Sequence, residues 1–109
     1  MKLNNIIKIY VPSTINVNEK TDNSKQIEKT SLFLSSLFGG CTCVNALGNW
    51  IDSNNKLVTE SITICYSFCD SRTFRKSKKE IIKYCRELCA EMSQECISLE
   101  LNNKLYFIG

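Results

Sequence analysis

Residues 41–69, CTCVNALGNWIDSNNKLVTESITICYSFC, carry the pattern that decides the predicted fold. Two β-rich runs, 41–51 and 57–69, flank the turn-forming residues DSNNK, and this arrangement is typical of a β-hairpin. Both runs are long enough to cross a small domain, since a strand rises about 3.3 Å per residue. We therefore predict two long antiparallel strands joined by a turn centred on Asn54.

The second run alternates between apolar and small polar side chains, so the hairpin has two different faces. We predict that the apolar parity faces the core, and it contains Val58, Ile62, Ile64, Tyr66 and Phe68, with Val44 and Ala46 opposite Ile64 and Ile62. The other parity is predicted to form an open face with Cys41, Cys43, Thr63, Cys65 and Ser67, and with Ile51 and Leu57 near its end. Because uncovered sheet surfaces invite association, we expect a homodimer through this face or through an edge strand.

Strand and helix patterns flank the hairpin on both sides. An apolar run ended by Pro12 predicts a first strand, and Gly39 and Gly40 end a stretch with helical spacing. Ser77 and Glu80 form a capping-box pattern before a second amphipathic stretch, and an Asn-Asn turn separates two short apolar runs near the end. The predicted elements are strand 6–11, helix 24–38, helix 76–92, strand 96–101 and strand 104–108.

The order of these elements is β-α-β-β-α-β-β. Two right-handed split βαβ crossovers in this order produce a ferredoxin-like two-layer sandwich with one extra edge strand. We therefore predict an α+β fold in which both helices cover one face of a mostly antiparallel sheet. The length of 109 residues is that of one domain, so residues 1–109 are predicted to form a single compact unit.

The composition excludes several kinds of chemistry. The chain contains no histidine, which removes the commonest general base, the Ser/His and Cys/His nucleophile pairs and mixed Cys/His zinc sites. No apolar run approaches the roughly 18 residues that span a bilayer, and the start MKLNNIIKIY lacks the pattern of a signal peptide. We expect a cytoplasmic protein without membrane association and without a cofactor.

Seven cysteines would suggest a disulfide framework in a secreted protein, but their number is odd and no export signal is present. A thiolate zinc site needs four converging ligands, whereas Cys65 and Cys69 would lie roughly 13 Å apart on an extended strand. The spacings also lack paired CxxC knuckles. We therefore predict free thiols that serve as small core or sheet residues and no metal site.

A cluster of basic residues surrounds the start of the second predicted helix. It consists of Arg72, Arg75, Lys76, Lys78, Lys79 and Lys83, with Arg86 further on. Cations at a helix N-terminus oppose the helix dipole, so the cluster has a small energetic cost. A solvated helix face explains it, and the alternatives are an acidic protein surface or nucleic acid. The net charge of +3 does not favour sequence-specific nucleic-acid binding.

Glu60 lies on the apolar parity of the hairpin, opposite Gly48 and near Trp50. A carboxylate on a core-facing position would be desolvated, as a general acid or base often is. A bulge at Gly48 would instead turn it towards solvent. If Glu60 lies in a ligand pocket, we expect that pocket between the hairpin and the first helix, with Tyr10 and Tyr66 as further polar groups.

Several short motifs carry a resemblance to a known group of proteins. They are Tyr10-Val11-Pro12-Ser13-Thr14, Phe38-Gly39-Gly40, Thr42, Gly48, Trp50, Leu57-Val58, Glu60 and Leu105-Tyr106. In this order they resemble a family of small uncharacterised proteins from bacteria, plasmids and phages, and the resemblance spans almost the whole chain. It implies a small protein of mobile or accessory genes, and such proteins are often inhibitors of host defence machinery.

Two functional hypotheses follow. The favoured one is a non-catalytic phage or mobile-element inhibitor, comparable to an anti-CRISPR protein, which binds a host protein or a nucleic-acid complex. It would use the basic cluster and the polar loop from Ser13 to Asn23. The alternative is a small enzyme or ligand-binding domain with a pocket near Glu60, Tyr10 and Tyr66. A concave pocket that contains Glu60 would favour the alternative.

Overall fold

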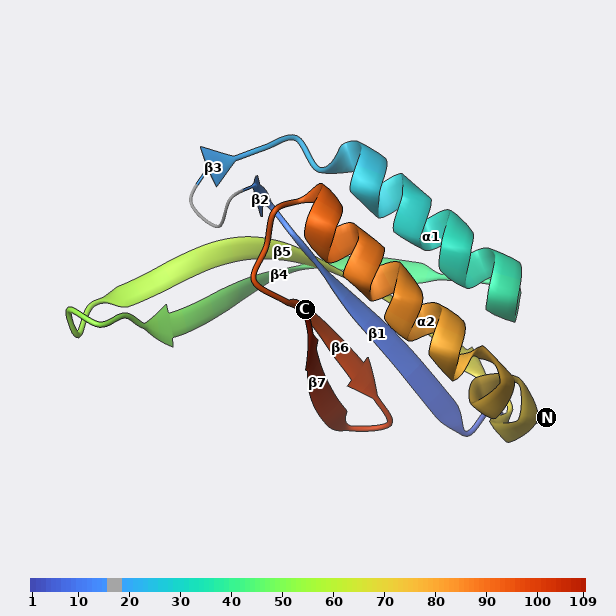
Figure 1. The fold of residues 1–109 in the computed structure, drawn as a ribbon. Coiled ribbons are helices and arrows are strands. Elements are labelled where there is room, and N and C mark those ends of the chain that lie inside the picture. Colours follow the sequence, from blue (N-terminus) through green and yellow to red (C-terminus); the bar gives the residue numbers. More distant parts are fainter. Residues whose placement is uncertain (16–18) are drawn as a thin grey trace.

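The computed structural model describes residues 1–15 and 19–109, and it has the predicted two-layer α+β architecture (Figure 1). The elements are β1 (Asn5–Pro12), β2 (Thr14–Ile15), β3 (Glu19–Lys20), α1 (Ser24–Phe38), β4 (Thr42–Ile51), β5 (Leu57–Cys69), α2 (Ser71–Glu91), β6 (Ile97–Leu101) and β7 (Lys104–Ile108). The main sheet is antiparallel with the order β4-β5-β1-β6-β7. Without β7, this is the strand order of a ferredoxin-like sandwich.

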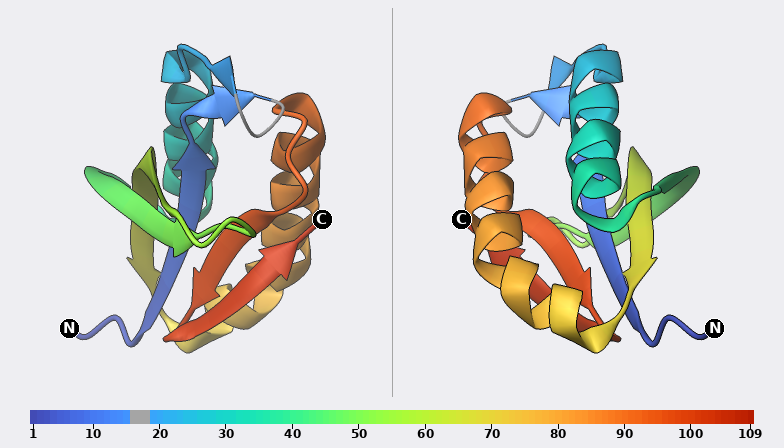
Figure 2. Two further views of the ribbon diagram at one scale, coloured as in Figure 1. Left: turned by 90° about the vertical axis from the view of Figure 1, so that its left-hand side faces the viewer. Right: turned by 90° about the vertical axis from the view of Figure 1, so that its right-hand side faces the viewer.

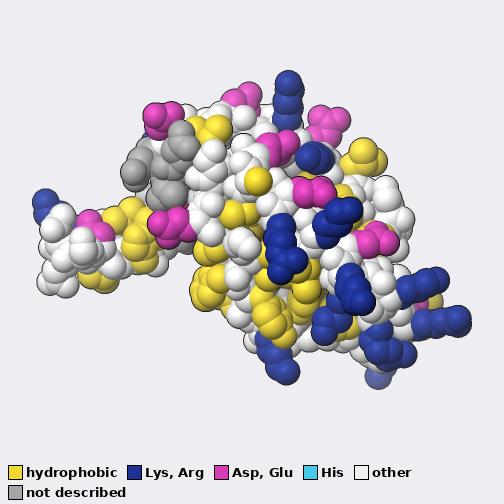
Figure 3. Space-filling view, in the orientation of Figure 1, with side chains coloured by type: hydrophobic (Ala, Val, Ile, Leu, Met, Phe, Trp, Pro, Cys, Tyr) yellow, Lys and Arg dark blue, Asp and Glu magenta, His cyan; other side chains and the backbone are white. Residues whose placement is uncertain are grey.

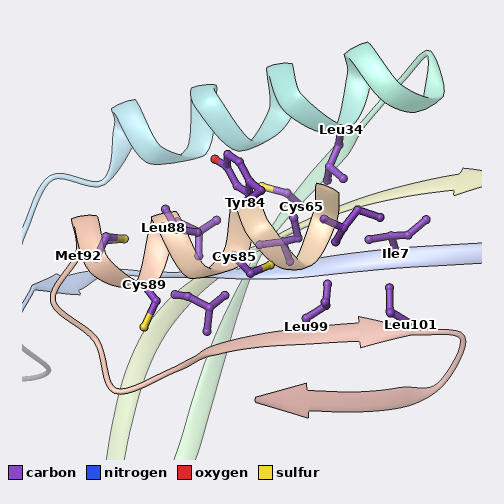
Figure 4. Close-up of a cluster of buried hydrophobic side chains, with 14 of the residues drawn as sticks. Ile7, Leu34, Cys65, Tyr84, Cys85, Leu88, Cys89, Met92, Leu99 and Leu101 are labelled. Atoms are coloured by element: carbon purple, nitrogen blue, oxygen red, sulfur yellow. The ribbon is translucent and has the colours of Figure 1, made fainter. Parts of the chain in front are cut away.

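Both helices cover the same face of the sheet and lie side by side, with β1 running between them (Figure 2). The core forms where β1 meets the helices, because its alternate residues Ile7, Ile9 and Val11 all point to that side and are fully buried. Figure 4 shows Leu34 of α1 and Leu88 of α2 among the side chains that close over β1 and β6. The predicted fold and its one-sided helix layer are therefore confirmed.

The hairpin register is also as predicted. Val44 pairs with Ile64, and Gly48 pairs directly with Glu60, so the ladder continues through Gly48 without a bulge. The Asn102-Asn103 turn between β6 and β7 has positive φ values of 51° and 69° at its two central residues, as a type I′ turn requires.

The assignment of the hairpin faces was wrong. Thr63, Cys65 and Ser67 face the helices and are buried, whereas Phe68 is 49% exposed on the opposite face of the sheet. The register of β1 against β5 is the physical reason, since Ile9 is the partner of Cys65 and cross-strand partners share a face. Small side chains there leave room for α1. The open face is therefore the apolar one: Val44, Ile62, Ile64, Tyr66, Phe68, Leu105 and Phe107 lie on it.

Two element boundaries differ from the predictions. Helix α2 begins at Ser71, five residues before the predicted start, because the Asp70 side chain accepts a hydrogen bond from the Thr73 backbone N–H at 2.7 Å and caps the helix there. This hydrogen bond lowers the pKa of Asp70. Ser77, the predicted cap, lies inside the helix and is buried. The predicted polar loop 13–23 contains β2 and β3, which pair with each other.

Candidate functional site

The β4–β5 hairpin extends past the rest of the sheet as an arm (Figure 1). Strand β1 ends its pairing with β5 at Pro12 and Ile62, so the remainder of β5 towards Leu57 has only β4 beside it. The chain turns after Pro12 and brings β2 and β3 next to this unpaired edge. A groove of about 430 Å³ forms between them, lined by Ser13, Thr14, Lys20, Thr21, Leu47, Trp50, Val58, Thr59, Glu60 and Ser61.

Glu60 is the acidic residue of this groove, and its carboxylate is held in place by β2. The buried Thr14 hydroxyl donates a hydrogen bond to Glu60 Oε1 at 2.9 Å. The Gln94 side chain in turn donates to the Thr14 backbone carbonyl at 2.8 Å, which ties β2 to the end of α2. The position of the Glu60 carboxylate therefore depends on three segments that are distant in sequence.

The groove has the groups that attract a small cation. Trp50 and Glu60 lie on the same face of the arm. Trp50 is the strand partner of Val58, and Val58 is two residues from Glu60 on β5, so all three side chains point to one side. An aromatic face and a carboxylate each stabilise a cationic ligand, and together they do so without a histidine. Lys20 lines the same groove, so the groove also contains a basic residue.

Tyr10 and Tyr66 do not line the groove, although they share the open sheet face with Glu60. The Tyr10 hydroxyl donates a hydrogen bond to Glu100 Oε1 at 2.9 Å, and burial together with this bond raises the pKa of Tyr10. The Tyr66 ring packs edge-on against Phe68, with ring centroids 6.1 Å apart. The predicted pocket therefore retains Trp50 and Glu60 and lies between the hairpin and β2–β3 instead of between the hairpin and α1.

The basic cluster lies at the other end of the molecule. The residues of this cluster are all exposed on α2, between its start and Lys83: Arg72, Arg75, Lys76, Lys78, Lys79 and Lys83. Figure 3 shows the Lys and Arg side chains gathered over this end of the molecule, away from the arm. Helix α2 follows the Cys69 end of β5, whereas Glu60 lies near the opposite end of that strand. These residues therefore cannot contribute contacts to a ligand in the groove.

The predicted pocket included Glu60 and Trp50 but not Thr14, Lys20 and Thr21, which the sequence analysis placed only in the polar loop 13–23 expected to bind a partner. They occur in a polar segment without periodicity, and only the packing of that segment against the arm brings them to the groove. Within the part of the chain that the structure describes, no group of three or more Cys, Asp or Glu side chains is arranged to hold a metal ion. No helix in residues 1–15 and 19–109 is long and apolar enough to cross a membrane.

Comparison with known proteins gives matches at the level of structure. No family model matches the chain, and no curated protein matches it. A solved structure described as a phage SAM lyase in complex with S-methyl-5'-thioadenosine matches with a TM-score of 0.68 and 14% identity, covering 99% of this chain and 91% of that one. A phage SAM lyase in the apo state matches with a TM-score of 0.61 and 16% identity, covering 95% and 87%. The similarity extends over nearly the full length of both folds.

These matches overturn the favoured functional hypothesis. The interpretation as a non-catalytic inhibitor was wrong, because the solved proteins that share this fold are described as an enzyme, one of them with a bound small molecule. They agree better with the alternative hypothesis of a small enzyme or ligand-binding domain with a pocket near Glu60. The chain is thus a small α+β protein whose fold is similar to that of a phage SAM lyase.

Proposed function

We propose that this chain binds S-adenosylmethionine (SAM) in the groove of Glu60 and Trp50 and cleaves it to S-methyl-5'-thioadenosine. The observation that carries the proposal is the Glu60 carboxylate, which Thr14 holds at 2.9 Å in a groove that also contains Trp50. SAM is a sulfonium cation, and a carboxylate beside an aromatic ring is a suitable site for a small cation. The volume of about 430 Å³ lies within the ordinary range of small-molecule pockets.

The charges of the groove match those of the substrate. Glu60 would attract the sulfonium, and Lys20 would attract the carboxylate at the end of the amino-acid moiety. Trp50 and Val58 provide apolar surface for the adenosyl part. Gly48, Trp50 and Glu60 also belong to the motifs that carry the family resemblance, so we expect the same groove in that family.

The reaction suits a chain without histidine. Formation of S-methyl-5'-thioadenosine requires cleavage of the bond between the sulfur and the carbon chain of the amino-acid moiety. The two electrons of that bond stay on sulfur, and the sulfonium becomes a neutral thioether. The carbon that leaves sulfur gains a bond in the same step, because the carboxylate of the same amino-acid moiety attacks it and closes a five-membered lactone. A neutral thioether leaves without taking up a proton, so the leaving group needs no general acid. The protein would contribute mainly by binding and orienting the substrate.

The direct test is to incubate the purified protein with SAM and to measure SAM and S-methyl-5'-thioadenosine by liquid chromatography with mass spectrometry. We expect equimolar loss of one and gain of the other. At SAM concentrations below KM, Glu60→Gln should reduce the rate, whereas Lys79→Gln, in the basic cluster at the other end of the molecule, should not. Intact SAM after prolonged incubation, together with no SAM binding by calorimetry, would refute the proposal.

A further inference from the structure

Two thiols at the base of the arm lie in direct contact. The Cys43 thiol of β4 donates a hydrogen bond to the sulfur of Cys65 of β5, with the two Sγ atoms 3.2 Å apart. The two residues are also cross-strand partners in the β4–β5 register. Their contact therefore depends on the backbone ladder as well as on side-chain rotamers.

The backbone geometry is suitable for a covalent bridge. Directly opposed residues of an antiparallel pair have Cα atoms about 4.5–5.5 Å apart, and disulfides typically join Cα atoms about 4.4–6.8 Å apart. The two strands pair on both sides of this position, from Thr42 with Tyr66 to Ile51 with Leu57, so the bridge needs no new backbone arrangement. Cys69, Cys85 and Cys89 are buried, and the Cys89 thiol donates a hydrogen bond to the Gln94 carbonyl at 3.0 Å.

The two thiols differ in access to solvent. Cys43 is exposed, whereas Cys65 is fully buried between the sheet and the helices. Burial, assisted by the neighbouring Cys43, raises the pKa of the Cys65 thiol. A soluble oxidant can thus reach Cys43, and Cys65 is protected from direct oxidation but lies close enough to react with an oxidised Cys43.

We propose that Cys43 and Cys65 are a redox pair and that hydrogen peroxide converts them into a cross-strand disulfide. In the first step the Cys43 thiolate attacks peroxide, an S–O bond forms, the O–O bond breaks, and the departing hydroxide takes up a proton to become water. In the second step the Cys65 sulfur displaces the hydroxyl group from the Cys43 sulfenic acid. The S–S bond forms, and the proton of Cys65 leaves with the hydroxyl group as a second water.

Cys41 is the competing thiol. It lies just before β4, near Cys43 and Cys65, and is partly exposed, and burial raises its pKa. It is not the cross-strand partner of either residue, since β4 begins at Thr42. The bridge is therefore expected between Cys43 and Cys65. It would lie roughly 17 Å along β5 from Glu60, outside the groove. Its formation is measured by mass and by cross-linked peptides, so the test does not depend on SAM cleavage.

The experiment treats the reduced, folded protein with one equivalent of hydrogen peroxide and then alkylates the remaining thiols. We expect the intact mass before alkylation to fall by about 2 Da and two thiols to be lost to alkylation, because a disulfide contains two hydrogens fewer than the two thiols. Tryptic peptides 30–56 and 57–72 should become linked, since Lys29, Lys56 and Arg72 are the cleavage sites. Dithiothreitol should reverse all three changes.

Matched variants identify the pair. Cys41→Ser and Cys69→Ser should retain the mass loss and the cross-link, and Cys43→Ser should abolish both. Circular dichroism of Cys43→Ser should be unchanged, because its side chain is exposed. The proposal would be overturned by a link between Cys41 and Cys43, by a cross-link that persists in Cys43→Ser, or by a gain of oxygen mass without any cross-link.

Discussion

Replacing Glu60 with Gln removes one negative charge from the groove and leaves the length of the side chain unchanged. The Thr14 hydroxyl, now 2.9 Å from Glu60 Oε1, can still donate to the oxygen of the new amide. Glu60 is half-buried on the arm and lies outside the core. We therefore expect the free energy of unfolding to change by no more than about 0.5 kcal/mol, the usual range for residues away from the core.

The effect on a cationic ligand should be much larger. An interaction with a charged group contributes about 1.5–3 kcal/mol, and each 1.4 kcal/mol corresponds to a tenfold change in affinity. Glu60→Gln should therefore weaken SAM binding about 10- to 100-fold. The loss should be mainly in KM, because the positive charge on sulfur is present in bound SAM and declines as the bond to carbon breaks.

Isothermal titration calorimetry with two ligands makes the assay specific for charge. S-adenosylhomocysteine has the same adenosyl and amino-acid parts as SAM, but its sulfur is a neutral thioether. Glu60→Gln should weaken SAM binding about 10- to 100-fold and should change S-adenosylhomocysteine binding less than about threefold. An equal loss for both ligands would refute a role in sulfonium recognition and would place the Glu60 contact elsewhere on the ligand.

Three further predictions concern the groove, the core and the open face. Trp50→Leu keeps an apolar side chain but removes the aromatic face, so SAM binding should weaken about 2- to 30-fold, while binding of the neutral S-adenosylhomocysteine changes less; calorimetry with these two ligands checks this. The pKa values of Cys85 and Tyr84 are raised to about 12, mainly by burial, from 9.0 and 10.0. Their contribution to stability is therefore complete below about pH 9 and is lost between about pH 9 and 12. Urea denaturation should show a free energy of unfolding that falls over that range. The fall should be shallower in Cys85→Ala. The exposed Phe68 and Leu105 on the open face predict a homodimer, which Phe68→Lys with Leu105→Lys should convert to monomer by light scattering; a wild-type monomer at high micromolar concentration would contradict this.

The local sequence predicted most of the secondary structure and the order of the sheet. Period-2 alternation identified β5, and the Asn102-Asn103 pair, whose residue type tolerates the positive φ values of a type I′ turn, identified the β6–β7 hairpin. Each of these patterns depends on neighbouring residues alone. Helix α1 has the predicted bounds, since Gly39 ends it with a φ of 87° that other residues rarely adopt. The start of α2 was missed because both Asp70 and Ser77 are plausible caps in sequence.

The tertiary structure decided which face of the hairpin is covered. Alternation separates two faces but does not say which one meets the helices. Here Ile9 of β1 pairs with Cys65 of β5, so the face with the small residues of β5 lies under the helices and the apolar residues lie on the open face. The groove has the same origin. Glu60 could be singled out from its position in β5, but Thr14 and Lys20 come from a segment without periodicity. Their place beside Glu60 follows only from where β1 stops pairing, a long-range property that no local pattern encodes.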